Sequence, residues 1–275
     1  MKKSYEQKVK LRLCFYTAMG IFLVFLALFG EKMAPYDPYE TNMMAIDMPP
    51  GKDFLLGTDN LGRDIFSRIL AGAKNSLTAA LIIMAITVTV GTLLGVAAGY
   101  YGGILDAVIM KIVLIFQSFP GQVMAIAVAG ILGAGTKNAA LALGAVGWTG
   151  YARIARSMVV KIKGANYIRA ARLYGCSSLS VIFHHVLPNI RSVIFVHGMT
   201  SLSGTILEIS SLSFLGLSAK PPVPEWGFMM NEGRKVLLTA PWQALTPGIA
   251  ILFVVVILNR LGDSVQDYME LRSGR

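Results

Sequence analysis

The residues most able to do chemistry are one acid inside an apolar stretch and a small group of imidazole and thiol side chains. Glu208 lies within a long apolar segment, where an unpaired carboxylate is costly and must face the helix bundle, a cavity or a polar neighbour such as Ser210. Cys176, His184 and His185 fall in one basic segment. Nucleophilic catalysis and metal binding both use such side chains when they face one another.

The spacing of these residues argues against a catalytic or metal centre. An intramembrane hydrolase would need paired catalytic residues facing one another in the spans, and Glu208 is the one acid well inside a span. Adjacent histidines with a distant Cys176 lack a recognisable ligand spacing. Two alternatives stay open at this point: a membrane enzyme, and a secondary transporter driven by protons on Glu208. Three methionines of an outer loop indicate flexible loop more than a soft-metal site: Met43, Met44 and Met48.

The composition is that of a membrane protein. The 275 residues are 55% hydrophobic and 15% charged, with a mean hydropathy of +0.61. A span of about 30 Å of hydrocarbon needs about 20 apolar residues. Six such stretches predict an all-α integral membrane protein with six transmembrane helices, at 13–30, 76–100, 104–132, 139–155, 190–212 and 245–261. The first is long and lacks a clear cleavage site, which favours an uncleaved anchor over a signal peptide.

The net charge of +10 follows the ends of these spans and does not form one nucleic-acid-binding face. Basic residues gather at the amino terminus and after the fourth span, and the positive-inside rule places both on the cytoplasmic side, with both termini. The loop of residues 31–75 is richer in acids, as expected outside. Cys14 and Cys176 then lie on or near the reducing side, so no disulfide is expected.

The chain is therefore predicted to divide at residue 75. Residues 1–75 hold the anchor helix and an outer loop that ends in an amphipathic helix, with apolar Ile65 and Phe66 opposite Arg63, Asp64 and Arg68. Residues 76–275 hold five spans and a cytoplasmic loop at 157–190. This amphipathic helix is expected to lie along the outer membrane face.

Glycine and proline punctuate the second and third spans. Gly91 and Gly95 have the spacing that lets membrane helices approach closely, and no Lys-Ser or Lys-Thr follows them to make a phosphate loop. The segment around Pro120 interrupts the third span near its middle and frees backbone carbonyls. A packing kink and a binding feature are both compatible with this break.

The segment 167–189 contains no Asp or Glu and predicts two short helices separated by Gly175. Pro188 is expected to stop the second helix. Ala170 and Ala171 present little side chain, so this face could enter a narrow cleft on a partner. An ordinary connector between two spans is the alternative.

Six motifs occur in a specific order along nearly the whole chain: GTDNLGRDIFSR from Gly57, GYYGG from Gly99, AARLYG from Ala170 with HVLPN from His185, SLSFLGL from Ser211, PPVPEWG from Pro221 and LGDSVQDYME from Leu261. With them the chain resembles the permease subunits of binding-protein-dependent ABC importers, in the branch that moves dipeptides, oligopeptides or nickel. The cytoplasmic loop of that family has a Glu where this chain has Arg169. The remaining pattern positions match: Ala170, Ala171, Gly175, Leu187 and Pro188.

The resemblance implies a type I ABC importer permease that forms half of a translocation pathway. Its cytoplasmic loop would form coupling helices that enter a groove of an ATPase subunit, with these residues at the contact: Arg169, Ala170, Ala171, Arg172, Gly175, Leu187 and Pro188. Implied partners are a second homologous permease, two cytoplasmic ATPases that hold ATP and Mg²⁺, and an extracytoplasmic binding protein. The chain would bind no cofactor or metal itself and would lie in a bacterial inner membrane.

Two further sets of positions complete the expected sites, the first implied by the resemblance and the second by the apolar spans. The outer loop, expected to face the binding protein or the other permease, carries the motif positions Gly57, Asp59, Gly62, Arg63 and Asp64. Glu208 and Pro120 are the candidates for the pathway or for polar contacts in the bundle. Peptide and nickel importers share these motifs, so both substrates remain open from the sequence.

Overall fold

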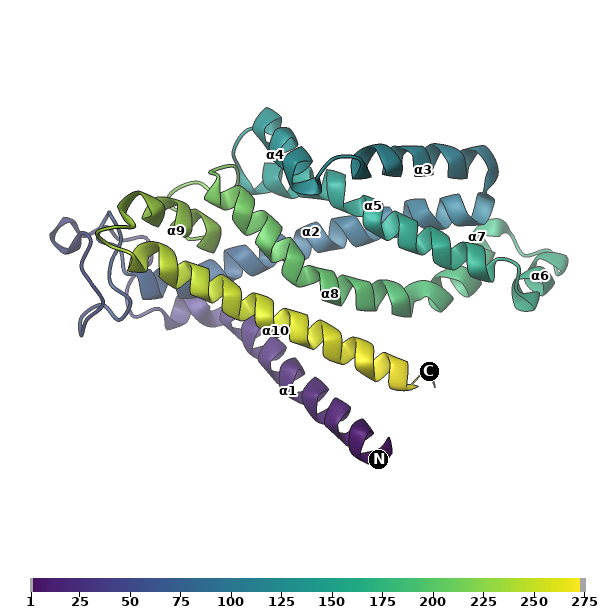
Figure 1. Cartoon of the computed structure of the whole chain (residues 1–275), viewed down its shortest axis with the longest axis horizontal. Helices are drawn as coiled ribbons and strands as arrows, with labels where there is room; N and C mark the ends of the chain where they lie inside the picture. Colours follow the sequence, from purple (N-terminus) through teal and green to yellow (C-terminus); the bar gives the residue numbers. More distant parts are fainter. Residues whose placement is uncertain (1, 273–275) are drawn as a thin grey trace. The chain divides into compact units, whose positions relative to one another are not determined.

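The computed structural model describes residues 2–272, with the side chains of residues 5–271, and every regular element in this part is a helix. The side chains of Lys2 and Lys3, which belong to the predicted basic amino terminus, lie outside the described part. The α-helices (Figure 1) are α1 (Lys2–Phe29), α2 (Ile65–Tyr101), α3 (Gly103–Gln117), α4 (Gly121–Leu132), α5 (Thr136–Ile162), α6 (Asn166–Leu173), α7 (Ser178–Val181), α8 (Leu187–Phe214), α9 (Trp226–Gly233) and α10 (Trp242–Arg272). Four short helical segments accompany them: η1 (Gly30–Met33), η2 (Met43–Ala45), η3 (Ile182–Val186) and η4 (Arg234–Val236).

The chain forms two compact units. Unit 1 contains Met1–Ile82, Val128–Leu141 and Met199–Arg275, and unit 2 contains Ile83–Ala127 and Ala142–Gly198. Unit 1 therefore carries α1, the outer loop, α9 and α10, whereas unit 2 carries α3, α6 and α7. The long helices α2, α5 and α8 contribute residues to both.

Five of the six predicted spans fall within helical segments, and the third, 104–132, is divided by a break at residues 118–120. The count of six stays a prediction. Four helical segments within the described residues are long and apolar enough to cross a membrane, and a fifth is added if α3 and α4 are one broken span. The helix α5 does not reach the same apolarity, because Gly, Thr, Trp and Arg residues interrupt its apolar stretch. The all-helical membrane class is confirmed.

The break at Pro120 is sharper than a kink. The helices α3 and α4 meet at 90° across the short connection of Ser118, Phe119 and Pro120. Proline has no backbone N–H and cannot continue the ladder of the preceding helix. Its own carbonyl oxygen accepts a hydrogen bond from the amide of Met124 at 3.2 Å, so Pro120 already belongs to the first turn of α4.

The prediction of a surface helix before the second span is wrong. The segment from Gly57 to Asp64 is a folded loop, and Ile65 begins the continuous helix α2 that runs to Tyr101. The boundary at residue 75 thus falls inside α2. Arg63 and Arg68, expected on a solvated polar face, are each only 1% exposed.

The glycines of α2 confirm the expectation of close helix packing within unit 2. A side chain at Gly91 would overlap the backbone of Trp148, and one at Gly95 would overlap the backbone of Ala152. Both partners lie on α5. Only hydrogen fits at these two positions, so the α2 and α5 backbones approach as closely as small residues allow.

In unit 1 the first and last long helices lie side by side (Figure 1). Gly20 of α1 faces Leu261 of α10, whose methyl group would be 3.1 Å from any Cβ added at Gly20. Helix α1 begins and helix α10 ends at the same end of this pair.

Candidate functional site

The cytoplasmic loop of the sequence analysis is built on the short helix α6. Ile168 is fully buried and Ala171 is 8% exposed, and the two occupy one face of α6 because they are three residues apart. This face packs into an apolar cluster of unit 2 that includes Val159, Val181 and Val186. The expectation that both alanines face a partner is therefore only partly met: Ala171 packs on its own chain, and Ala170 is half-buried.

Gly175 ends α6 in a Schellman motif. Its amide donates to the carbonyl of Arg172 at 3.0 Å, and the next amide, of Cys176, donates to the carbonyl of Ala171 at 3.1 Å. Gly175 has a φ of +79°, in the left-handed region that glycine adopts without cost. No atom lies within 4 Å of the position a Cβ would take. The turn therefore requires glycine for its backbone conformation and not for space.

Pro188 does not stop the second helix, contrary to the sequence expectation. One turn of π-helix, Ile182–Val186, connects α7 to α8, and the amide of Leu187 donates to the carbonyl of Ile182 five residues back. Pro188 follows within the first turn of α8, where a missing N–H is tolerated best. The second coupling segment and the fifth span are thus one continuous helical stretch, Ser178–Phe214.

Two basic side chains of the loop, and one from α5 just before it, contact neighbouring helices of unit 2. The guanidinium carbon of Arg172 lies 4.7 Å from the centre of the Tyr100 ring, a cation–π contact. Arg156 donates two hydrogen bonds to Asp106, at 2.9 and 2.6 Å. The ammonium of Lys163 donates to the carbonyl of Gly99 at 3.1 Å. Lys163 and Arg172 therefore attach the loop to the end of α2, and Arg156 attaches α5 to the start of α3.

The outward face of the loop is basic and apolar. Leu173 is 88% and Tyr174 is 89% exposed, and Arg169 is exposed beside them. Exposed large apolar side chains next to a folded turn are typical of a protein interface. Leu187 is half-buried and Pro188 exposed, so the predicted coupling residues divide into a packed set and an outward set.

The outer loop contains a buried charge network in unit 1. Asp59 pairs with Arg63 at 2.6 Å and lies 3.5 Å from the Nε atom of Arg68. Glu232 of α9 approaches both arginines, at 3.1 Å from Arg63 and 3.4 Å from Arg68. Arg68 also donates to the carbonyl of Pro38 at 3.1 Å. Two cations and two anions are thus brought together within a buried site.

The remaining motif positions of this loop shape its backbone. Asp64 caps α2, because its Oδ2 atom accepts hydrogen bonds from the amide and hydroxyl of Ser67 at 2.8 and 2.6 Å. Gly57 and Gly62 are buried turn residues with φ of +75° and +72°. All five predicted outer-loop positions are buried, so they hold the loop in place and do not form its outer surface.

The short helix α9 is held by a buried acid, Glu225. Its carboxylate accepts hydrogen bonds from the amides of Gly227 at 3.1 Å and Phe228 at 2.9 Å, and from the hydroxyl of Ser76 at 3.3 Å. Burial raises the pKa of the Glu225 carboxyl, and these hydrogen bonds act in the opposite direction. Trp226, next along the chain, donates from its ring to the carbonyl of Ile69 at 3.0 Å.

Glu208 is exposed on α8 and does not point into the core of its own chain. The expected hydrogen bond to Ser210 or Ser211 is absent from the described residues: Ser211 donates to the carbonyl of Leu207, and the Ser210 hydroxyl is buried without a partner. Pro120 is also exposed. Gly204, one turn before Glu208, is exposed as well, so the acid lies on an outward strip of α8.

The histidine and cysteine candidates are not assembled into a site. Among the described residues, no group of three His, Cys, Asp or Glu side chains is placed to hold a metal ion. His184 lies with Nδ1 3.0 Å from the carbonyl of Ser180, one turn back on its own helix. Cys176 and Cys14 are both exposed thiols without a disulfide.

Sequence reasoning missed several residues that complete these sites. Glu232 supplies both arginines of the outer network with a second acid, and it lies 169 residues after Arg63. Tyr100 contacts Arg172 of the cytoplasmic loop, and Asp106 pairs with Arg156 of α5. The tyrosines of the GYYGG motif, and Asp106 in the apolar stretch 104–132, were visible in the sequence. Their partners could not be assigned without the fold.

Comparison with known proteins identifies the family. Residues 91–275 match the family described as binding-protein-dependent transport system inner membrane component. The chain is 38% identical to a glutathione transport system permease protein of Pectobacterium atrosepticum, over 92% of this chain and 85% of the relative. It is 36% identical to the dipeptide transport system permease protein of Haemophilus influenzae, over 91% and 88% of the two chains.

A third relative, the dipeptide transport system permease protein of Alkalihalophilus pseudofirmus, is 37% identical over 90% of this chain and 81% of its own. These matches extend over nearly the whole chain, and they agree with a multi-pass helical membrane protein. The chain belongs to the family of inner-membrane components of binding-protein-dependent transport systems, and it is the permease subunit of an ABC importer.

Proposed function

We propose that this permease carries short peptides. The observation that supports this substrate is its 36–38% identity, over about nine tenths of the chain, to permeases named for dipeptides and for glutathione, itself a small peptide. Nickel takes second place, because the relatives above are named for peptides. The outward face of α8 around Glu208 contains polar and small residues suited to a hydrated path.

The chain forms half of the pathway and pairs with a second, homologous permease. Glu208 supports this arrangement, because an exposed acid in the middle of a membrane helix is stable only against protein or water, and its own chain leaves it uncovered. The facing permease would cover this strip. Both termini and the loop of α6 and α7 lie in the cytoplasm in this arrangement, in accord with their basic residues.

The outward residues of the loop contact a cytoplasmic ATPase subunit. Tyr174 and Leu173 supply apolar area for a groove, and Arg169 adds a positive charge where related permeases carry a Glu. ATP and Mg²⁺ bind to two such ATPase subunits, and a separate binding protein delivers the substrate from outside. ATP binding then biases two arrangements of the helices through this contact.

Transport in reconstituted vesicles tests the substrate. The complete importer, with its binding protein outside and ATP inside, is given a labelled dipeptide or ⁶³Ni²⁺. We expect dipeptide uptake that unlabelled peptide suppresses and excess nickel does not. Nickel uptake without dipeptide uptake would reverse the assignment of substrate.

The same vesicles separate the ABC mechanism from a proton-driven one. Uptake is expected to stop when a non-hydrolysable ATP analogue replaces ATP, and to continue when an uncoupler collapses the proton gradient. The opposite pattern would support the transporter driven through Glu208. Glu208→Gln should lower the maximal uptake rate without lowering the thermal stability of the complex if the acid lines the path.

A further inference from the structure

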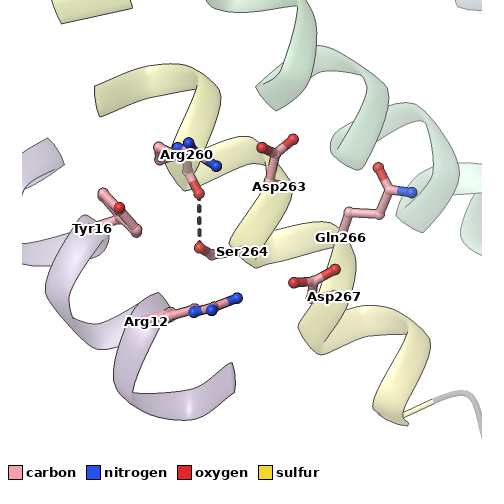
Figure 2. A pocket seen from close by; sticks show the side chains of 7 residues that line it. All are labelled: Arg12, Tyr16, Arg260, Asp263, Ser264, Gln266 and Asp267. Atoms are coloured by element: carbon pink, nitrogen blue, oxygen red, sulfur yellow. Dashed lines mark hydrogen bonds between the residues drawn. The ribbon is translucent and has the colours of Figure 1, made fainter. Parts of the chain in front are cut away.

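A polar cavity of about 560 Å³ opens between the start of α1 and the end of α10, both in unit 1 (Figure 2). Its size is in the range of small-molecule sites. Two α1 residues and five α10 residues line it: Arg12, Tyr16, Arg260, Asp263, Ser264, Gln266 and Asp267. Neither the transport pathway nor the ATPase contact proposed above uses these side chains.

The charges around this cavity are balanced but not paired with one another. It has two guanidinium groups, Arg12 and Arg260, and two carboxylates, Asp263 and Asp267. Among the described residues, no ion pair connects any of these four side chains to another. The buried charge network of Arg63, Arg68, Asp59 and Glu232 also has two arginines and two acids, and there the charges form ion pairs. The cavity therefore presents separate positive and negative groups to an occupant.

The sequence positions of its lining residues place the cavity at the expected depth of the lipid headgroups. Arg12 directly precedes the apolar stretch of α1, and Arg260 lies at the end of the apolar stretch of α10. Tyr16 is one turn further into α1, in the position of an interfacial aromatic side chain. On the membrane side of the cavity, Phe15 is 59% and Val256 is 49% exposed. Apolar surface for acyl chains thus adjoins the polar lining.

We propose that this cavity binds the phosphoethanolamine headgroup of a membrane phospholipid. A guanidinium fork matches the oxygens of a phosphate, and a carboxylate accepts hydrogen bonds from a primary ammonium. The lining has no net charge, which suits a zwitterion better than an anionic lipid, since anionic lipids are bound by pockets that are basic overall. Phosphocholine fits less well, because its quaternary ammonium has no N–H to donate to Asp263 or Asp267.

Lipid binding to the intact importer complex tests this site. The complex is stripped of lipid in detergent, and its affinity for phosphatidylethanolamine, phosphatidylcholine and phosphatidylglycerol is measured by native mass spectrometry. We expect phosphatidylethanolamine to bind at least about tenfold more tightly than either other lipid, because only its ammonium group can donate hydrogen bonds to the two carboxylates. Equal affinity for phosphatidylethanolamine and phosphatidylcholine would overturn the proposal.

Charge-removing variants assign the two halves of the headgroup. Asp263→Asn with Asp267→Asn should remove the preference for phosphatidylethanolamine while leaving phosphatidylglycerol affinity unchanged or higher. Arg12→Gln with Arg260→Gln should weaken both lipids. Lys10→Gln is the matched control, because it removes a cation from the exposed surface of α1 without touching the cavity.

The phosphatidylglycerol arm also shows that the aspartate variant is folded. Retention of the phosphatidylethanolamine preference in that variant would overturn the site. Soluble glycerophosphoethanolamine distinguishes a lipid from a free metabolite: it should compete only at concentrations far above that of the lipid, because it lacks acyl chains to bury. Competition at equal concentration would overturn the membrane source of the ligand.

Discussion

The outer loop and the cytoplasmic loop use the same charged residue types in opposite ways. In the outer loop, Arg63 and Arg68 are 1% exposed and are held by two acids. In the cytoplasmic loop, Arg169 is exposed beside Tyr174, which is 89% exposed. The first motif is directed inward and fixes its own chain, and the second is directed outward and leaves side chains for a partner.

The comparison shows that burial decides the role of a charged motif. Buried charges stabilise the chain itself, and exposed charges remain available to a partner. The outer motif contains more charged residues than the cytoplasmic one, but they form ion pairs and hydrogen bonds within unit 1. The cytoplasmic motif fixes only one face of α6, through Ile168 and Ala171, and ends it with Gly175. A substitution in the outer motif should therefore act on stability, and a substitution on the outward face of the cytoplasmic loop should act on coupling.

The largest effect is expected from breaking the outer network. Arg63→Met leaves Asp59 and Glu232 without their main cation, and removing one partner of a buried ion pair costs about 3–5 kcal/mol. The thermal unfolding midpoint of the purified complex should fall accordingly. Lys74→Met is the matched control, because the Lys74–Glu31 pair is exposed and 3.9 Å long. Equal midpoints for the two variants would show that the network contributes no more than a surface ion pair.

The next effect compares the two faces of the cytoplasmic loop directly. Ile168→Ala empties a fully buried site in unit 2 and should lower stability by about 2–5 kcal/mol. Tyr174→Ala removes an exposed ring and should leave the unfolding midpoint within the range of surface substitutions, about ±0.5 kcal/mol.

Tyr174→Ala should instead weaken binding of the ATPase subunit by about 2 kcal/mol, the usual loss for a central interface aromatic. Pull-down of the ATPase with the purified permease pair measures this, and uptake by vesicles follows it. If Tyr174→Ala lowers the midpoint as far as Ile168→Ala while ATPase binding is unchanged, the division of the loop into inward and outward faces is wrong.

Features that depend on the residues of one helix were predictable from the sequence, and contacts between distant segments were not. Apolar stretches of span length predicted the helices, Pro120 predicted a break, and Gly91 with Gly95 predicted close packing. All of these signals are local, because each depends on the residues of one helix. Glu232 of α9 could not be assigned to Arg63, since the residues around an acid do not reveal a partner 169 residues away.

Two errors in the prediction have clear physical causes. Arg63, Asp64 and Arg68 alternate with apolar residues in a pattern typical of a surface helix. Burial of the two arginines is tolerable because Asp59 and Glu232 pair with them, and Asp64 is buried as the cap of α2. Pro188 was expected to end a helix because it lacks an N–H, but a first-turn position needs none, and the preceding π turn shifts the hydrogen bonds. In both cases tertiary context outweighed a local rule.

A smaller effect is expected from the turn that connects the two coupling helices. Gly175→Ala forces a Cβ into the left-handed region, at a cost of roughly 1–2 kcal/mol, although no atom lies nearby. Coupled uptake should fall while insertion of the chain into the membrane is unchanged. Gly150→Ala in α5 is the control, because its Cβ would also meet open space but its backbone is helical. Equal uptake by the Gly175→Ala and Gly150→Ala variants would show that the turn has no special role.

The last and smallest effect is a dependence on pH at Glu225, a buried acid that forms no ion pair among the described residues. Burial raises the pKa of this carboxyl in the folded protein, so the native state binds more protons than the unfolded state between the unfolded pKa, about 4.3, and the raised folded value. The free energy of unfolding contributed by Glu225 therefore falls as pH rises through this window.

Glu225→Gln cannot titrate, and its unfolding midpoint relative to the parent complex should rise with pH. Glu40→Gln, which removes an exposed acid, controls for the loss of one charge. A midpoint difference that falls with increasing pH would mean that the three hydrogen bonds to the carboxylate outweigh its burial.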